Sequence, residues 1–243
     1  IGPSMPFALV NDLHVGFALN KIYDQHAVSF EAPLWFFRAG GMVGGVIPKF
    51  KPGNPIDYKY LTAHFMGTTD QVLVAYYSYG TDCLRIAAPE DRLRTDLGND
   101  EGMLVSLSNP IWIDPVPAVP VVPLASIFGP EPEHGWCYSF QKMELARQEQ
   151  KWEEASRLAD DAEARGLVAK NPMEYTPVIL AYLNTGQPEK AVKASLAAQK
   201  MDATKTEYLC SLWNQNKTLA TETLAQTKIA LMCASSTSPE EKK

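Results

Sequence analysis

Two segments of the chain share a pattern of residues at a fixed spacing. One contains Lys151–Ala155 followed by Ala162, and the other contains Gln187–Ala191 followed by Ala198, so that matching positions lie 36 residues apart. A period of this length is typical of helix-turn-helix repeats that stack on one another. The spacing predicts that the C-terminal part of the chain is a short helical-repeat module, a class of domain that usually binds other molecules. A plain helical bundle is the alternative.

Turn and capping residues predict where the helices of this module begin and end. Gly166 and Gly186 are suited to the ends of helices, and Pro172 and Pro188 are suited to first helical turns. Polar residues beyond position 234 predict a frayed tail over 235–243. The expected helices are 136–148, 152–165, 172–184 and 188–200, followed by a capping pair over 207–213 and 219–233.

The N-terminal part carries both helix and strand signals, which predicts a small α+β layer. Alternating β-branched and aromatic residues predict a hairpin from 71–77 and 83–87. Apolar spacing predicts a helix over 9–23, and also a short helix over 56–65 with Asn54 as its cap. Further expected elements are strands at 27–30 and 34–38 and a helical turn at 103–108.

Seven prolines lie between Pro110 and Pro132. Proline fixes φ and removes a backbone donor, so this stretch is expected to run extended as a semi-rigid connector. Its interleaved apolar residues predict that it lies against one or both domains. The predicted organisation is an α+β domain at 1–109, a connector at 110–132, an all-α helical-repeat domain at 133–234 and a tail at 235–243.

The composition limits the classes of partner and of metal site. A net charge of -6 with dispersed basic residues argues against nucleic acid as a partner. The spacing of Cys83, Cys137, Cys210 and Cys233 fits no zinc or redox motif, which favours four buried small hydrophobic residues. The alternative is one disulfide in an extracytoplasmic domain, and Cys137 with Cys210 is then the expected pair.

Catalytic signatures are sparse. The four histidines have no metal-ligand spacing, and no nucleotide fingerprint or nucleophile motif is present, so we expect no cofactor and no metal site. The paired carboxylates Glu153-Glu154 and Asp160-Asp161 are interpreted as parts of a solvated helix face. The glycine-rich run 40–45 is interpreted as a turn, because it lacks the ending of a phosphate-binding loop.

One cluster between the connector and the first repeat helix combines prolines with acidic, imidazole and aromatic groups. Such a mixture is able to line an interdomain groove that contacts a sugar or a peptide. The alternative is that the two aromatic residues anchor the core and the acidic residues favour the helix N-terminus through its dipole. The candidate binding residues are Glu131, His134, Trp136, Tyr138 and Arg85.

Two resemblances extend this interpretation. Residues 181–191 with Ala198 resemble the core of a tetratricopeptide repeat, although Gln150 stands where the first repeat would have glycine. Residues 128–138, 144–148 with Trp152, and 209–213 are similar to the soluble C-terminal domain of polytopic membrane proteins from Chloroflexi-type bacteria, and residues 19–23 and 83–86 match the same pattern. The layout of those proteins is similar to that of membrane-embedded glycosyltransferases, which implies an extracytoplasmic accessory domain.

These observations predict a non-catalytic, extracytoplasmic domain of a membrane-associated protein that binds a protein or a glycan. The alternative function is the substrate-binding part of a glycan-processing enzyme of glycosyltransferase type. The chain has no apolar run of about 20 residues and begins without a signal peptide, so it is expected to be soluble as given. A cytoplasmic location is the alternative to an extracytoplasmic one.

Overall fold

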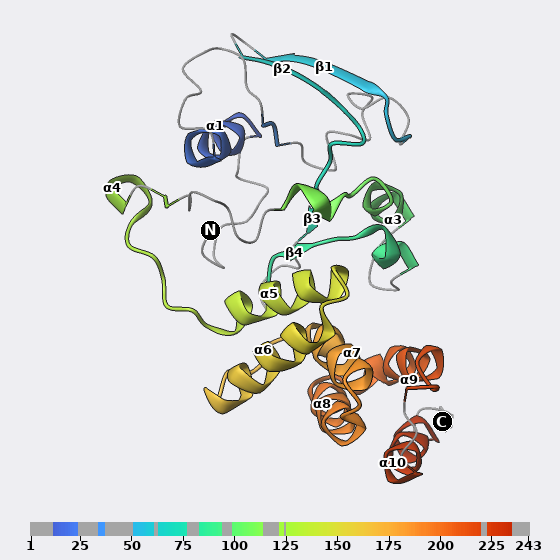
Figure 1. The fold of residues 1–243 in the computed structure, drawn as a ribbon. Helices are drawn as coiled ribbons and strands as arrows, with labels where there is room; N and C mark the ends of the chain where they lie inside the picture. The colour runs from blue at the N-terminus through green and yellow to red at the C-terminus, as the bar shows by residue number, and fades with distance from the viewer. Residues whose placement is uncertain are drawn as a thin grey trace, which may run out of the picture. The chain divides into compact units, whose positions relative to one another are not determined.

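The computed structural model describes residues 12–23, 34–36, 51–60, 63–76, 83–93, 99–113, 122–123, 125–219 and 223–234. Over these residues the fold is mixed, with many helices and two small two-stranded sheets (Figure 1). The chain divides into two compact units. The first comprises Ile1–Tyr76 and Ile86–Glu133, and the second comprises Tyr77–Arg85 and His134–Lys243.

The first described element of the first unit is helix α1 (Asp12–Tyr23), which confirms the expected helix over its described residues. Asn20 on α1 is buried, and its side chain forms hydrogen bonds with the backbone of α1 itself and with the backbone of the segment around Leu34. Its amide nitrogen donates to the carbonyls of Gly16 (2.7 Å) and Leu34 (2.6 Å), and its Oδ1 accepts from the Leu34 amide (2.9 Å). Asn20 therefore fixes the segment around Leu34 on the helix.

The expected helix over 56–65 is wrong, because these residues form an antiparallel hairpin. Strand β1 (Pro55–Tyr60) pairs with β2 (Ala63–Thr68), and Tyr58 lies opposite Phe65. Ile56 is buried whereas its neighbour Asp57 is exposed, which is the alternation of a strand with one covered face. The apolar spacing that indicated a helix is divided between the two strands.

The hairpin predicted from 71–77 and 83–87 is present with shorter strands.

The connector is not extended throughout, since two short helical turns interrupt it, and the first uses Pro110 at its opening position. Of the strands expected at 27–30 and 34–38, only 34–36 lie within the described residues, and these are not strand. The glycine-rich run 40–45 also lies outside the described residues. The remaining elements are β3 (Ala75–Tyr76), β4 (Arg85–Ile86), η3 (Pro89–Leu93), α3 (Asn99–Val105), η4 (Pro110–Trp112) and α4 (Ala125–Phe128).

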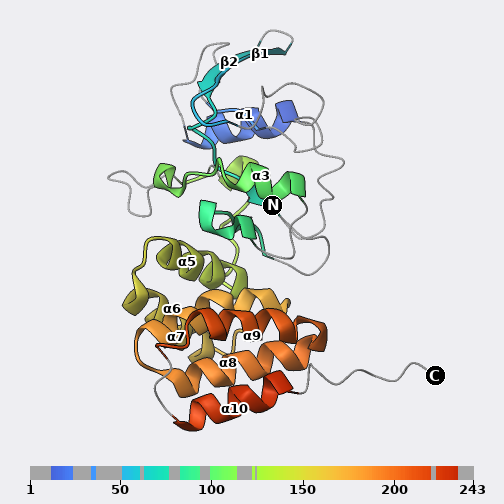
Figure 2. The ribbon, with the colours of Figure 1, turned by 90° about the vertical axis from the view of Figure 1, so that its right-hand side faces the viewer.

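The second unit consists mainly of helices that follow one another as pairs. Helix α7 is central, in contact with α5, α6 and α8, and all but two of its side chains are buried. Helix α10 packs on α8 and α9 at the far end of the module from α5 (Figure 2). The elements are α5 (Trp136–Gln148), α6 (Trp152–Ala164), η5 (Pro172–Tyr175), α7 (Thr176–Asn184), α8 (Pro188–Met201), η6 (Ala203–Lys205), α9 (Thr206–Gln215) and α10 (Thr223–Ala234).

The turns between α5 and α6 and between α7 and α8 have the same hydrogen bonds at positions 36 apart. The amide of Lys151 donates to the carbonyl of Ala146 at 2.8 Å, and the amide of Gln187 donates to that of Tyr182, also at 2.8 Å. The residues before these donors, Gln150 and Gly186, have φ values of 58° and 67°. Gln150 therefore adopts the left-handed conformation that glycine supplies in the second turn.

All four cysteines are in disulfides, so the interpretation of them as buried small hydrophobic residues is wrong. The expected Cys137–Cys210 pair is also wrong. Cys83 bonds to Cys137, because residues 77–85 belong to the helical unit, and Cys210 on α9 bonds to Cys233 on α10. The second bridge fixes the last helix pair.

Candidate functional site

The five candidate binding residues are divided between the two compact units. Glu131 is exposed and belongs to the first unit, whereas the other four belong to the second. Within the second unit, Trp136 is half-buried at the start of α5, and His134 and Tyr138 are exposed near it. Arg85 is buried, with 3% of its surface exposed. Within the second unit, the exposed His134 and Tyr138 and the buried Arg85 therefore lie in different surroundings.

The indole of Trp136 is engaged by a buried carboxylate that the sequence did not indicate. Its Nε1–H donates to Oε2 of Glu174 at 2.7 Å, and Glu174 has 0% of its surface exposed. The other oxygen, Oε1, accepts from the amide of Cys83 at 2.8 Å, and Oε2 also accepts from the amide of Lys170 at 3.2 Å. One carboxylate thus joins the start of α5, the 83–85 segment and the loop before η5.

The segment that contains Cys83 is held on α5 by several contacts besides Glu174. Its neighbour Leu84 accepts a hydrogen bond at its carbonyl from Gln141 Nε2 at 3.2 Å. The guanidinium carbon of Arg85 lies 5.5 Å from the ring centroid of Phe140, which is 1% exposed. Together with the Cys83–Cys137 bond, these contacts make the segment part of the covering of the helical core. Arg85 is placed there as a packing residue.

His134 and Tyr138 form a stacked pair on the surface of the module. Their ring centroids are 3.6 Å apart and their planes differ by 4°. The ammonium of Lys142 lies 5.0 Å from the centroid of the Tyr138 ring, and the guanidinium of Arg165 donates to the carbonyl of His134. The Tyr138 ring is therefore already engaged by two side chains of the same chain.

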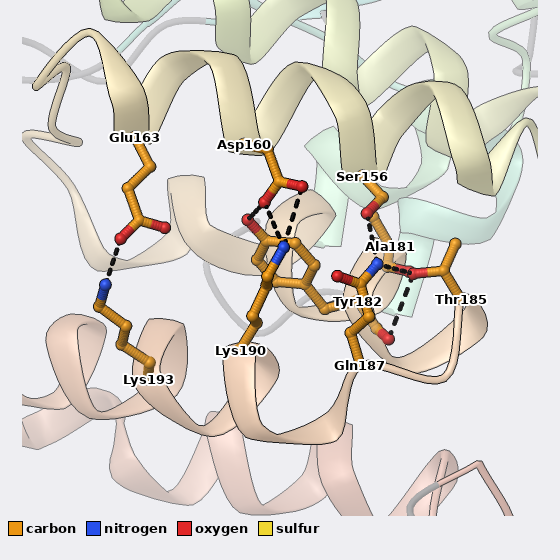
Figure 3. Close-up of polar contacts among 9 residues, drawn as sticks. All are labelled: Ser156, Asp160, Glu163, Ala181, Tyr182, Thr185, Gln187, Lys190 and Lys193. Carbon is orange, nitrogen blue, oxygen red and sulfur yellow. Dashed lines mark hydrogen bonds and ion pairs between the residues drawn. The ribbon is translucent and has the colours of Figure 1, made fainter.

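A second polar cluster lies between α6 and the α7–α8 pair, and its centre is Asp160 (Figure 3). The phenol of Tyr182 donates to Asp160 Oδ1 at 2.8 Å. The ammonium of Lys190 donates to Oδ1 at 2.7 Å and to Oδ2 at 2.9 Å, and it lies 5.2 Å from the Tyr182 ring centroid. Glu153, Glu154 and Asp161 are exposed, as expected for a solvated helix face. The side chain of Asp160 is also 46% exposed, and in addition it connects α6 to α7 and α8.

These contacts shift the pKa of both partners. Burial raises the pKa of Asp160, but the hydrogen bonds from Lys190 and Tyr182 and the charge of Lys190 outweigh burial, so that its pKa lies below the usual value. Burial is the largest cause of a raised pKa for Tyr182, and its bond to Asp160 adds to the effect. Both shifts hold the pair in its ordinary form, a carboxylate that accepts from a neutral phenol.

The same interface is extended on both sides of Asp160. On one side, Gln187 Nε2 donates to Ser156 Oγ and to Thr185 Oγ1, both at 2.9 Å (Figure 3). On the other side, Lys193 is paired with Glu163. Because Ser156, Asp160 and Glu163 are spaced along one face of α6, the interactions form a row. This row fixes the first helix pair against the second.

The helical spacing of these residues was visible in the sequence, but their partners were not. Ser156, Asp160 and Glu163 follow the spacing of one helix face, while Lys190 and Lys193 lie on another helix about thirty positions later. Glu174 stands between Met173 and Tyr175 in the sequence. A carboxylate that follows Pro172 would ordinarily be assigned to the first turn of an exposed helix. No residue pattern predicts that it is buried.

Within the described part of the chain, no group of three or more His, Cys, Asp and Glu side chains has the geometry to hold a metal ion. None of the helices that the structure describes is long and apolar enough to cross a membrane. Comparison of the chain with protein-family models gives no match. Comparison with curated proteins and with solved structures gives none either.

Proposed function

We propose that the helical unit is a tetratricopeptide-like module with which the chain binds a protein partner as a non-catalytic scaffolding domain. The observation that carries this proposal is the equivalence of the two helix-helix turns. Gln150 and Gly186 both have a positive φ, and the amides that follow them donate to carbonyls at matching positions, those of Ala146 and Tyr182. Repeated helix pairs of this kind usually present extended surfaces to other molecules.

Small residues at matching positions support the same assignment. Ala155 and Ala191, 36 positions apart, both have 0% of their surface exposed, and Ala162 and Ala198 have 1% and 0%. Small side chains at these positions allow the paired helices to approach closely. Helices α9 and α10, joined by a disulfide, follow as a third pair. The three helix pairs then form a short repeat array. Because it has few repeats, its binding surface is smaller than that of a long array.

The two disulfides favour an extracytoplasmic location for the module. Disulfides persist in oxidising compartments and are rare in the cytosol. Cys83–Cys137 and Cys210–Cys233 are 54 and 23 residues apart in sequence. In the chain-entropy description, loops of these lengths stabilise the folded state by about 4 and about 3 kcal/mol. The fold therefore gains most from a compartment in which both bonds form.

A protein partner is favoured over a glycan by the state of the aromatic residues. A sugar would stack on an aromatic face and hydrogen-bond to polar groups beside it. The indole N–H of Trp136 is already bonded to Glu174, and Tyr138 is stacked against His134. The alternative function, the substrate-binding part of a glycan-processing enzyme, would require these residues to exchange their present contacts for a ligand.

Site-specific photo-crosslinking in cells that express the parent protein tests the proposal. A photoreactive amino acid at Tyr138 on α5 or at Ser211 on α9 reports on the first helix of a pair, and both positions are exposed. The expected result is one adduct with the same protein from both positions. The matched control is Arg157, exposed on α6, the second helix of its pair, which is expected to give no such adduct.

Titration of the purified, oxidised chain with oligosaccharides tests the alternative. The scaffolding proposal predicts no saturable binding of glycans. Saturable binding that Trp136→Phe abolishes, together with the absence of a protein adduct from Tyr138 and Ser211, would overturn the proposal in favour of the glycan-processing function. Mass spectrometry of the chain isolated from its native compartment tests the location separately, and free thiols at all four cysteines would contradict an oxidising compartment.

A further inference from the structure

The two disulfides of the helical unit differ in how accessible their cysteines are to solvent. Cys137, in the first turn of α5, is exposed, whereas its partner Cys83 has 2% of its surface exposed. Cys210 and Cys233, which form the other bond, are both half-buried. Thiol–disulfide exchange requires a thiolate to reach one sulfur of the bond, so its rate depends on access. Cys137 is therefore the most accessible of the four cysteines to an attacking thiolate.

The two bonds also differ in the structures that they join. The second bond joins α9 to α10, helices of 10 and 12 residues that pack on each other. The first joins α5 to the short 83–85 segment, which is also held by the hydrogen bonds of Cys83 and Leu84 and by the contact of Arg85 with a ring on α5. A short segment opens locally at a smaller cost than two packed helices do. The first bond is therefore the easier one for a reductant to approach.

We propose that Cys137 is a thiol–disulfide exchange site, at which a dithiol oxidoreductase of the Cys-x-x-Cys class reduces the Cys83–Cys137 bond and frees the 83–85 segment from α5. A thiolate of the dithiol attacks Sγ of Cys137, the bond between the two Sγ atoms breaks, and Cys83 leaves as a thiolate that takes up a proton. The second thiol of the reductant then attacks the mixed disulfide and releases Cys137 as a thiol. The reductant loses two electrons and becomes a disulfide. This proposal does not depend on the protein-binding function.

Reduction removes the covalent part of the attachment between the 83–85 segment and α5. The intact bond keeps the Cys83 amide beside Glu174 and the Leu84 carbonyl beside Gln141, which raises the effective concentration of each pair of groups. Without the bond these contacts compete with water, and Gln141 is at an exposed position. Glu174 Oε1 then loses the Cys83 donor, while Oε2 keeps its own two donors. We therefore expect the segment to open while the helices stay folded.

Trapping of the mixed disulfide tests the exchange site. The probe is a thioredoxin in which the second active-site cysteine is replaced by Ser, so that the adduct is not resolved. It is incubated with the oxidised, folded full chain, and mass spectrometry maps the position of the adduct. The expected result is thioredoxin attached to Cys137. An adduct mainly at Cys83, Cys210 or Cys233, or no adduct at all, would overturn the proposal.

The rates of reduction of the two bonds give a second test. The oxidised chain is treated with dithiothreitol without denaturant, and samples are alkylated at intervals to count the free thiols at each cysteine. Cys83–Cys137 is expected to be reduced about tenfold faster than Cys210–Cys233, because its exposed end is easier to reach. Equal rates, or faster reduction of the second bond, would contradict the proposed selectivity.

Hydrogen exchange tests the opening of the 83–85 segment separately. After selective reduction, the amide of residue 83 is expected to lose its protection while the amides of α7 stay protected. The double variant Cys83→Ser with Cys137→Ser is expected to show the same loss without a reductant. The matched control is Cys210→Ser with Cys233→Ser, which keeps the first bond and is expected to keep the protection. A residue 83 amide that stays protected in the reduced, folded chain would refute the release of the segment.

Discussion

The phenol of Tyr182 on α7 and the ammonium of Lys190 on α8 donate to the same carboxylate oxygen, Oδ1 of Asp160 on α6. Three helices from two successive pairs therefore meet at one acceptor. These hydrogen bonds therefore contribute to the stability of the interface between the α5–α6 pair and the α7–α8 pair.

Replacing Tyr182 with Phe removes the hydroxyl and keeps the ring. We expect the free energy of unfolding to fall by about 1 kcal/mol, the net value of one hydrogen bond. The contact of Lys190 with the ring, at 5.2 Å, is retained. Urea denaturation followed by far-UV circular dichroism measures the change. Tyr138→Phe, at an exposed position outside this network, is the matched control, and equal losses in the two variants would contradict the role of the Asp160 bond.

The pH dependence of stability reports on Asp160. Its pKa in the folded state lies below the ordinary value of 3.8, so the folded state binds fewer protons than the unfolded state does near that pH. The stabilisation is complete above the unfolded pKa and is lost as the pH falls through the folded pKa. The advantage of the unmodified chain over Asp160→Asn is therefore expected at pH 7 and is expected to shrink below about pH 4.

Chemical denaturation of both chains across this pH range measures that difference. Asp161→Asn, next to Asp160 but exposed, is the control and is expected to change stability little. A difference between the unmodified chain and Asp160→Asn that is constant with pH would show that the carboxylate charge is not responsible.

Gln150 and Gly186 provide a reciprocal test of the two equivalent turns. Both have positive φ, which costs a non-glycine residue about 1 to 2 kcal/mol. Gln150→Gly is expected to stabilise the chain by up to about 1 kcal/mol, after the entropy cost of glycine. Gly186→Gln is expected to destabilise it by about 1 kcal/mol. Thermal unfolding measures both, and a destabilised Gln150→Gly variant would contradict the equivalence.

Removing the buried carboxylate of Glu174 is expected to have the largest effect. Glu174→Ala leaves three N–H donors without their acceptor, those of Trp136, Cys83 and Lys170, and costs about 3 kcal/mol or more. Differential scanning calorimetry measures the loss, and hydrogen exchange at the Cys83 amide is expected to accelerate. Glu153→Ala, which removes an exposed carboxylate on α6, is the control, and an equal loss there would contradict the role of burial.

The helices of the second unit were predictable because their signals are local and repeated. Gly186 and Pro188 mark a turn, and alanines at matching positions mark the tight helix contacts. The hairpin at β1 and β2 was not predictable in this way, since Tyr58 and Phe65 have a spacing that fits one helix face as well as two facing strands. Segments this short do not contain enough periods to distinguish the two structures.

The disulfide pairs and the candidate site depend on long-range contacts, which sequence spacing does not encode. Four cysteines allow three pairings, and the choice of Cys83 for Cys137 depends on residues 77–85 joining the helical unit. For the same reason the indole of Trp136 could be recognised as an anchor but not as a donor to Glu174, which is 38 residues away.

The Cys83–Cys137 bond closes a covalent ring that contains η3, α3, η4 and α4. A single proteolytic cut anywhere inside this ring opens it without releasing a fragment, because the two pieces stay joined through sulfur until a reductant acts. The part of the first unit that lies within the ring is therefore tethered to the helical module at both ends, and a chain nicked there would keep its mass, apart from one water, under non-reducing conditions.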